Sequence, residues 1–308
     1  DMTYYHYTSL DALRGIIRSS ENNGKGLCFW ATRYDCFVDK EEYLLGVDFT
    51  RKYLSIMEDE YDLKQDRRIA AFFRRETIEN NINLPNPYVI SVTARNDNAY
   101  MWENYADHGN GAVLEIDFPQ TRGIYDTAII YKLEKCIYED AIGDAELIRI
   151  VYEAYTDGGF ALLQGNKELF LGLLQKYPQL FVRFIAMYVL YFFAPRIKRN
   201  FFKQEEEFRM ILSAPVPAYT EFIHANAPLI DALTSALNMV LKSGDIVSPL
   251  LKEKMRTRDD RHIYYREFFL PESALTRICV RNFHAQSAVE ALLDRKGFEN
   301  VKCEILKY

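Results

Sequence analysis

Two spacings of hydrophobic residues alternate along the chain, and they predict an alternation of strands and helices. Residues 4–7 are β-favouring, and residues 10–17 then carry Leu and Ile at the three- and four-residue spacing of one helical face. Thr8 or Ser9 stands where a helix N-cap is expected. The start of the chain therefore predicts a short strand that runs directly into a helix.

The same two patterns recur to the end of the chain, separated by turns rich in Gly, Asn and Pro. Charge-rich helical segments are predicted up to about residue 80, a single helical turn at 101–106, and helices at 228–241 and 285–293. Strands are predicted at 27–32, 88–93, 112–118, 205–212, 264–270, 277–280 and 302–306, with one or two more in 125–138.

Residues 141–202 have a helical pattern with more apolar residues than an isolated pair of helices can bury. We therefore expect a helical insertion that packs on the β part, so that residues 1–308 form a single domain. The order of predicted elements indicates an α+β fold with mixed, largely antiparallel sheets.

Composition narrows the classes of protein. With 308 residues, 49% hydrophobic and 27% charged, the chain has the balance of an ordinary folded protein and enough length for a sizeable core. The formal charge of −6 argues against broad binding to nucleic acid or anionic membranes, which needs a surface excess of Lys and Arg. Local basic patches remain at residues 67–75 and 196–203, where a solvated helix face explains the charges as well.

The cysteines and the apolar stretches indicate the cellular setting. The five cysteines form no CxxC pair and no set with His at metal-ligand spacing, so we expect reduced thiols and a cytoplasmic location. No signal-peptide pattern is visible at the start. The longest apolar stretch, residues 184–194, is shorter than the ~20 residues of a membrane-spanning helix, so no membrane partner is expected.

The segment EEEFRMIL carries the strongest candidate chemistry. The period of two in a strand sends Glu205, Glu207 and Arg209 to one face and the apolar residues to the other. We predict that Arg209 pairs with Glu207 while Glu205 stays free to accept from a ligand hydroxyl. A solvated edge strand with cross-strand ion pairs explains the same pattern.

Two further residue pairs are candidates for ligand binding. His6 and Thr8 stand at the end of the first predicted strand, where a neutral imidazole can donate to a ribose hydroxyl; a core histidine beside a capping Thr8 is the alternative. Trp102 and Tyr105, three apart on one helical turn, present two rings together either to a flat ligand or to the core.

An acidic cluster raises the question of a metal. Asp39, Glu41 and Glu42 can hold a divalent ion together with Glu205 or Glu207, and complementarity to a helix N-terminus explains the cluster equally. The chain has no GxSxG, P-loop or HExxH motif and no Cys/His nucleophile pair. No resident metal is therefore expected.

Several segments together resemble a known bacterial family, domain of unknown function 2971, in order and spacing. The most specific are the MWxxYA turn that leads through a Gly loop into a strand, and the ExExR strand that follows a Lys. Where that family usually has Asn-Asp-Pro-x-Glu, this chain has VDKEE, so Asp39 and Glu42 match and the Asn is missing. The segments are YHYTSLDALRGII, LCFWATRYDCFVDKEEY, PYVISVTARNDNAYMWENYADHGNGAVLEIDF and FFKQEEEFRMIL.

A second resemblance, carried by fewer residues, is to the ADP-ribosyltransferases. These enzymes place His-x-Thr on an early strand and a Glu, sometimes as ExE, on a later one, an order that His6, Thr8, Glu205 and Glu207 fit. The resemblance implies an ADP-ribosyltransferase-like fold with NAD as substrate. It implies that His6 and Thr8 grip the nicotinamide ribose and that Glu207 stabilises the oxocarbenium by electrostatics.

Three functions are therefore expected in order. The first is an NAD-using, ADP-ribosyltransferase-like enzyme or a degenerate relative, with the acceptor unknown and both a protein and a nucleic acid left open. The second is a non-catalytic nucleotide-binding or sensor module with Arg209 as anion anchor. The third is a metal-dependent phosphoesterase built on Asp39, Glu42 and Glu205.

Overall fold

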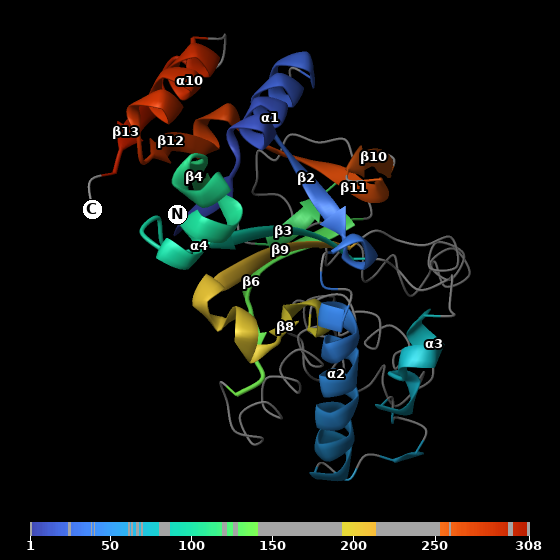
Figure 1. The fold of residues 1–308 in the computed structure, drawn as a ribbon. Helices are drawn as coiled ribbons and strands as arrows, with labels where there is room; N and C mark the ends of the chain where they lie inside the picture. Colours follow the sequence, from blue (N-terminus) through green and yellow to red (C-terminus); the bar gives the residue numbers. More distant parts are fainter. Residues whose placement is uncertain are drawn as a thin grey trace.

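The computed structural model describes residues 2–306, except 24–25, 38, 40, 61, 63, 66–67, 69, 80–86, 119–121, 126–128, 141–192, 214–252, 259 and 295–297. Figure 1 shows the fold. Its α-helices are α1 (Leu10–Asn23), α2 (Glu41–Glu60), α3 (Arg75–Glu79), α4 (Ala99–Tyr105) and α10 (Phe283–Leu293). Its 3₁₀ turns are η1 (Tyr34–Cys36), η3 (Ala70–Phe72), η4 (Asp107–Gly109), η6 (Ala194–Arg196), η7 (Asn200–Glu205) and η8 (Glu272–Ala274).

The strands of the described residues form one large sheet and one two-stranded sheet. The large sheet runs in the order β10-β11-β2-β3-β1-β4-β12-β13, and β9, β6 and β5 extend it from β3. Only the β12–β13 and β7–β8 pairs are parallel among these strands. The strands are β1 (Met2–Thr8), β2 (Leu27–Arg33), β3 (Pro87–Thr93), β4 (Ala112–Phe118), β5 (Arg122–Tyr125), β6 (Ile129–Lys135), β7 (Ile137–Tyr138), β8 (Ile197–Lys198), β9 (Glu207–Ser213), β10 (Lys254–Arg258), β11 (Arg261–Leu270), β12 (Leu275–Val280) and β13 (Lys302–Ile305).

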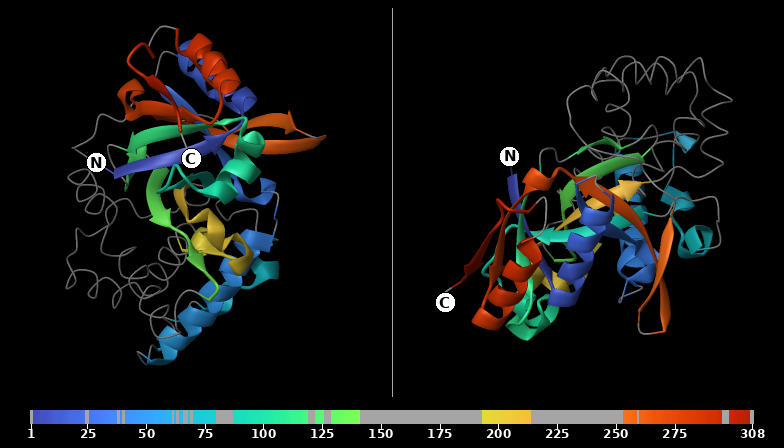
Figure 2. Two further views of the ribbon diagram at one scale, coloured as in Figure 1. Left: turned by 60° about the vertical axis from the view of Figure 1, so that its left-hand side comes forward. Right: turned by 90° about the horizontal axis from the view of Figure 1, so that it is seen from above.

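Each face of the sheet has its own hydrophobic cluster. Leu13 and Ile17 of α1 and Val289 of α10 join the larger cluster on one face, and α1 and α10 also contact each other (Figures 1 and 2). Trp102 of α4 lies in the smaller cluster on the opposite face, where its ring meets the edge of Tyr7. Helices thus cover both faces of the sheet.

Short polar side chains fix where the helices begin. Ser9 accepts from the backbone N–H of Ala12 at the start of α1, as one of the two predicted caps. Asn98 and Asn282 accept in the same way at the starts of α4 and α10. These bonds satisfy N–H groups that have no partner within a helix.

The α+β class with largely antiparallel sheets is confirmed, and β1, β2, β3, β4, β11, β12 and β13 lie at or near their predicted positions. Three predictions on elements were wrong. β10 was expected to be a polar connection. Glu205 belongs to η7, before the strand. Residues 193–202 of the expected helical insertion hold η6, β8 and the start of η7. Residues 141–192 and the predicted helix at 228–241 lie outside the described residues, and the single-domain prediction remains a prediction.

Candidate functional site

One edge of β3 is only partly paired with its neighbouring strands, β2 and β1. On its other edge β3 pairs with β9 from Pro87 to Thr93, without a gap. Toward β2 and β1, however, only Tyr88 and Val89 pair with β2, and only Thr93 pairs with β1. No described strand pairs with residues 90–92 on this edge. We call this opening between β1 and β2 the split.

His6 of β1 partly fills the split. Its Nδ1 lies 2.9 Å from the carbonyl oxygen of Ser91, and because a carbonyl oxygen only accepts, Nδ1 carries the hydrogen. The ring also meets Phe29 of β2 edge to face, with centroids 5.5 Å apart. Burial lowers the pKa of His6, against the opposing effect of the Ser91 bond, so the ring is neutral at pH 7.

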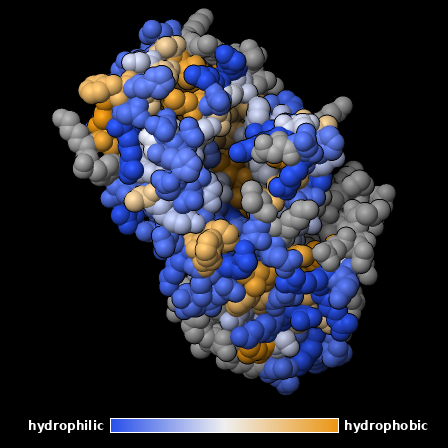
Figure 3. All heavy atoms as spheres, viewed as in Figure 1, coloured by the Kyte–Doolittle hydropathy of each residue, from blue (hydrophilic) through white to orange (hydrophobic). Residues whose placement is uncertain are grey.

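Ser91 is unusual because it lies on a central strand and yet its side chain is exposed, whereas every other residue of β3 is buried. Figure 3 shows the surface hollowed between the part that carries α1, α10 and β4 and the part that carries β2 and β11, with apolar residues at the base. The split is therefore open to solvent at the middle of the sheet.

Next to β3, strand β9 carries two buried charges. Glu207 stands opposite Thr93 and Arg209 opposite Ser91. Directly opposed residues share a face, and Thr93 is also opposite Tyr5 of β1, so His6 points to the other face from Glu207. The structure therefore does not bring His6 and Glu207 together.

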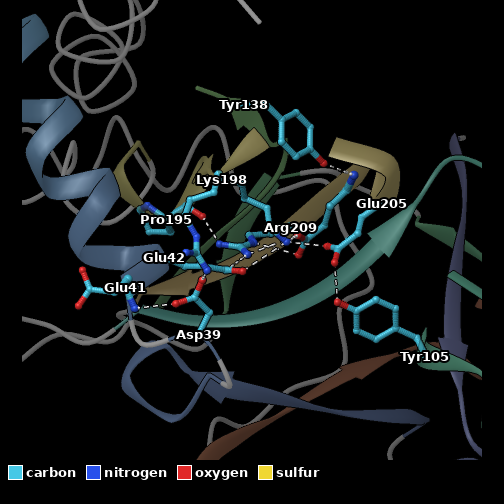
Figure 4. A network of polar contacts seen from close by, with 11 residues as sticks. Asp39, Glu41, Glu42, Tyr105, Tyr138, Pro195, Lys198, Glu205 and Arg209 are labelled. Carbon is cyan, nitrogen blue, oxygen red and sulfur yellow. Dashed lines mark hydrogen bonds and ion pairs between the residues drawn. The ribbon is translucent and has the colours of Figure 1, made fainter. Parts of the chain in front are cut away.

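Five buried charged residues form a charge network, which Figure 4 shows: Glu42, Lys198, Glu205, Glu207 and Arg209. The Lys198 ammonium lies 2.6 Å from Glu205 Oε2 and 2.5 Å from Glu207 Oε2. The side chain of Lys198 is only 3% exposed. The Lys198 ammonium of β8 thus binds both carboxylates. The prediction that Glu205 stays free was wrong.

Arg209 is the second cation of the charge network. Its Nε donates to Glu207 Oε1 at 2.9 Å, as predicted, and its Nη2 donates to Glu42 Oε2 of α2 at 2.5 Å. Its Nη1 donates to the carbonyl oxygen of Pro195 at 2.6 Å. Since all of its nitrogens are bonded and 3% of its side chain is exposed, Arg209 cannot anchor an anion without breaking these bonds.

Tyr105 connects the charge network to the surface. Its hydroxyl donates to Glu205 Oε1 at 2.5 Å, while the residue is 44% exposed. On the inner side, the Tyr138 hydroxyl accepts from the backbone N–H of Glu207 at 3.0 Å. Tyr105 is therefore the side chain through which a ligand at the surface can reach a buried carboxylate.

The two network carboxylates on η7 and β9 have pKa values shifted in opposite directions. Burial raises the pKa of Glu205 above its ordinary value, against the pull of Lys198. Burial alone would also raise the pKa of Glu207, but Arg209 and Lys198 outweigh burial and hold that pKa well below its ordinary value. Glu207 is a permanent carboxylate, whereas Glu205 can take up a proton more readily.

The backbone explains how both carboxylates reach one lysine. Glu206, between them, adopts the left-handed conformation with φ 48° and ψ 44° and ends η7. This reversal places Glu205 before the strand and still directs it to Lys198. Glu205 and Glu207 do share a partner, Lys198, but not because they alternate along one strand, as was predicted.

The structure divides the predicted site residues into two groups. Glu205, Glu207, Arg209 and Tyr105 meet in or at the charge network. Trp102 is fully buried and donates from Nε1 to Asn96 O, so it does not share a ligand face with Tyr105. The separated residues are His6, Thr8, which is buried at the end of β1, and Trp102.

Sequence reasoning missed Lys198, Tyr138 and Ser91. Lys198 was grouped with a basic patch in the expected helical insertion, and its Ile-Lys strand is too short to show alternation. Ser91 is a polar residue between apolar neighbours in the strand YVISVT, which was a usable signal for an exposed central position.

The carboxylates proposed for a metal are held by cations. Asp39 pairs with Arg199 and accepts from the backbone N–H of Glu41. Glu42 and Glu205 bind Arg209 and Lys198. Within the described ranges, no group of three or more His, Cys, Asp or Glu side chains is arranged to hold a metal ion. In the same ranges no helix is long and apolar enough to span a membrane.

Comparison with known proteins gives one match. Residues 101–210 match the model of a family described as protein of unknown function (DUF2971). No curated protein and no solved structure matches the chain. The matched stretch includes Tyr105, Lys198, Glu205, Glu207 and Arg209, and it excludes the region of the split on β1. The match supports the resemblance to domain of unknown function 2971 over residues 101–210, about a third of the chain.

Proposed function

We propose that the chain is a non-catalytic binding or sensor module for a nucleotide or dinucleotide, and that the ligand enters the split beside β3. The observation that carries this proposal is the exposed Ser91 on a central strand whose neighbouring edge has no strand partner at residues 90–92. Interior strands of a sheet are normally paired on both edges, so an open one has backbone groups available to a ligand.

The groups around the split suit a nucleotide. The carbonyl of Ser91 lies on the open edge, as its bond from His6 shows, and the N–H of the same residue points the same way. A carboxamide or base edge can bond such a pair of backbone groups. Nearby, the exposed ring of Tyr105 offers a stacking surface above Glu205, whose carboxylate can accept from a ribose hydroxyl.

An NAD-using, ADP-ribosyltransferase-like enzyme is the second candidate. The opposite pKa shifts of Glu205 and Glu207 favour it, because environments that separate the pKa values of two carboxyl groups mark acid–base pairs. Two features place it second. Arg209 and Lys198 already neutralise Glu207, which would otherwise stabilise an oxocarbenium, and His6 points to the other face.

Calorimetric titration with NAD, ADP-ribose and ATP tests the binding proposal. Ser91→Phe fills the split and should abolish binding, and His6→Ala should weaken it. Thr257→Phe is the matched control, since it adds the same ring to an exposed strand position outside the split. Binding that survives Ser91→Phe, or no binding of any of the three nucleotides by the wild type, would remove the proposal.

A turnover assay separates the two candidates. Nicotinamide released from NAD is measured for the wild type, Glu205→Gln, Glu207→Gln and the neighbouring Glu206→Gln, whose exposed carboxylate pairs with Arg95. The sensor proposal expects binding without nicotinamide. Release that is lost in Glu205→Gln or Glu207→Gln and kept in Glu206→Gln would establish the enzyme instead.

A further inference from the structure

The β10–β11 hairpin carries a second group of charges, far more open than the charge network. β10 is the last strand of its sheet path, and four of its five residues are exposed. The hairpin projects from the body of the molecule (Figure 2). Lys254, Arg256 and Arg258 alternate along β10, so they share one face and span about 14 Å at ~3.4 Å per residue.

Arg256 is held in place by aromatic rings. Its guanidinium lies over the ring of Trp30, 5.1 Å from the centroid, and 6.0 Å from the centroid of Tyr265. Trp30 and Tyr265 are themselves stacked, with centroids 4.7 Å apart and planes at 28°. A stacked guanidinium keeps its nitrogen-bearing edge available for hydrogen bonds, so the rings preorganise it.

The charge of Arg256 has no acid to neutralise it in the described part of the chain. Its Nε is buried and lacks an acceptor there. Lys254 binds the one buried acid of this face, Glu267, at 2.7 Å. Burial lowers the pKa of Arg256, and the charge of Arg258 lowers it further, which shows two like charges close together. Charged residues on an edge strand can prevent pairing with another strand without being stacked on rings and without lacking an acid partner. These two features of Arg256 therefore need another explanation.

We infer that the face formed by Lys254, Arg256, Arg258, Trp30 and Tyr265 binds single-stranded nucleic acid. An extended row of cations matches an extended polyanion rather than one phosphate. Tyr265 is buried and stacks on Trp30, whereas Trp30 is partly exposed and, with the guanidinium over it, is the ring on which an unpaired base can stack. A second copy of β10 would place Arg against Arg and is disfavoured. The overall charge of −6 makes the site local, so it binds weakly and only at low salt.

Fluorescence anisotropy of a 5′-fluorescein-labelled 20-nucleotide oligo-dT tests the inference, with the full chain titrated at 50 and 200 mM salt. Contact of all three cations with phosphates gives a slope of log K against log salt of about −2, since each contact with a single strand contributes ~0.7, and Lys254 must exchange Glu267 for a phosphate to take part. Arg256→Gln should weaken binding at least fivefold and make the slope shallower by about 0.7. Arg256→Lys, which keeps the charge and loses the planar stack, should fall between.

The control is Arg14→Gln on α1, which removes a charge from an exposed Arg paired with Asp11 and should leave binding unchanged. Thermal melting confirms that each variant folds. Equal losses in Arg256→Gln and Arg14→Gln, or no binding by the wild type at 50 mM salt, would overturn the inference. Equal or tighter binding of poly-glutamate, sensitive to Arg256→Gln, would also overturn it and assign the face to acidic peptides.

Discussion

The charge network and the basic face of the β10–β11 hairpin place similar residues on strands of one sheet and use them in opposite ways. In the charge network Arg209 is buried and bonded at every nitrogen. On the hairpin Arg256 is partly exposed, stacked on Trp30 and without an acid partner among the described residues. Burial with complete pairing makes a charge structural, whereas exposure without pairing leaves it available for a ligand.

Removing the cation from each region should give the largest difference. Arg209→Met leaves two buried carboxylates, Glu207 and Glu42, with Lys198 as the single cation beside both among the described residues, so we expect a loss of about 3–5 kcal/mol in the free energy of unfolding. Arg256→Met should change it by less than about 0.5 kcal/mol. Urea unfolding of both variants measures the contrast. Equal stabilities would mean that the charge network does not hold the fold together.

Acid should affect the charge network first. The pKa of Glu207 is lower in the folded protein than its ordinary value of 4.5. Its stabilisation is therefore complete above about pH 4.5 and declines as the pH falls, by ~1.4 kcal/mol per pH unit. Unfolding free energies between pH 5 and 2.5 should fall less steeply for Glu207→Gln than for the wild type. An unaltered slope in Glu207→Gln, with Glu206→Gln as control, would contradict the predicted shift.

Two helix glycines test how the charge network is positioned. A Cβ at Gly46 of α2 would fall on the carbonyl oxygen of Ala194, so Gly46→Ala must push α2, and with it Glu42, away from Arg209. We expect a loss of about 1–3 kcal/mol. Gly15→Ala in α1 meets nothing and should add ~0.5–1 kcal/mol through helix propensity. Thermal melts that show the same sign for both variants would argue against the close contact.

The smallest expected effect is at Tyr105. Tyr105→Phe keeps the ring and removes the donor to Glu205 Oε1, which costs about 1 kcal/mol. A ligand hydroxyl would take the place of the Tyr105 hydroxyl at Glu205, so Tyr105→Phe should not abolish nucleotide binding. Tyr105→Ala should weaken nucleotide binding, because the stacking ring is lost. Calorimetry on the two variants distinguishes the roles of hydroxyl and ring.

Local patterns in the sequence predicted much of the sheet and little of the site. Alternation correctly separated Glu207 and Arg209 from the apolar Phe208 and Met210, and it predicted their ion pair. Alternation carries no information on what covers a polar face. QEEEFRM and KMRTR look equally polar as strands. The first differs in the structure because Glu42 of α2 and Lys198 of β8 bind its charges.

The rest depended on pairing between distant segments. His6 and Glu207 were expected to share a site because both fit an order of motifs. The face of the sheet to which each side chain points is set by two strand pairings, β1 with β3 and β3 with β9. A shift of one residue in the register of either pairing would have put His6 and Glu207 on the same face. The meeting of Glu205 with Lys198 depends on the left-handed Glu206, which no periodicity predicts.

The split also has a mechanical consequence. On one side of it, β10, β11 and β2 are joined to β3 only through Tyr88 and Val89; on the other, β1 and its neighbours are joined through Thr93. Apart from these ladder bonds, the two halves are joined by His6, which bonds Ser91 and contacts Phe29, and by α1, which packs on β2 and contacts α10. A molecule seated on the free edge of β3 would complete the ladder at residues 90–92 and so join the two halves of the sheet along the whole length of this strand.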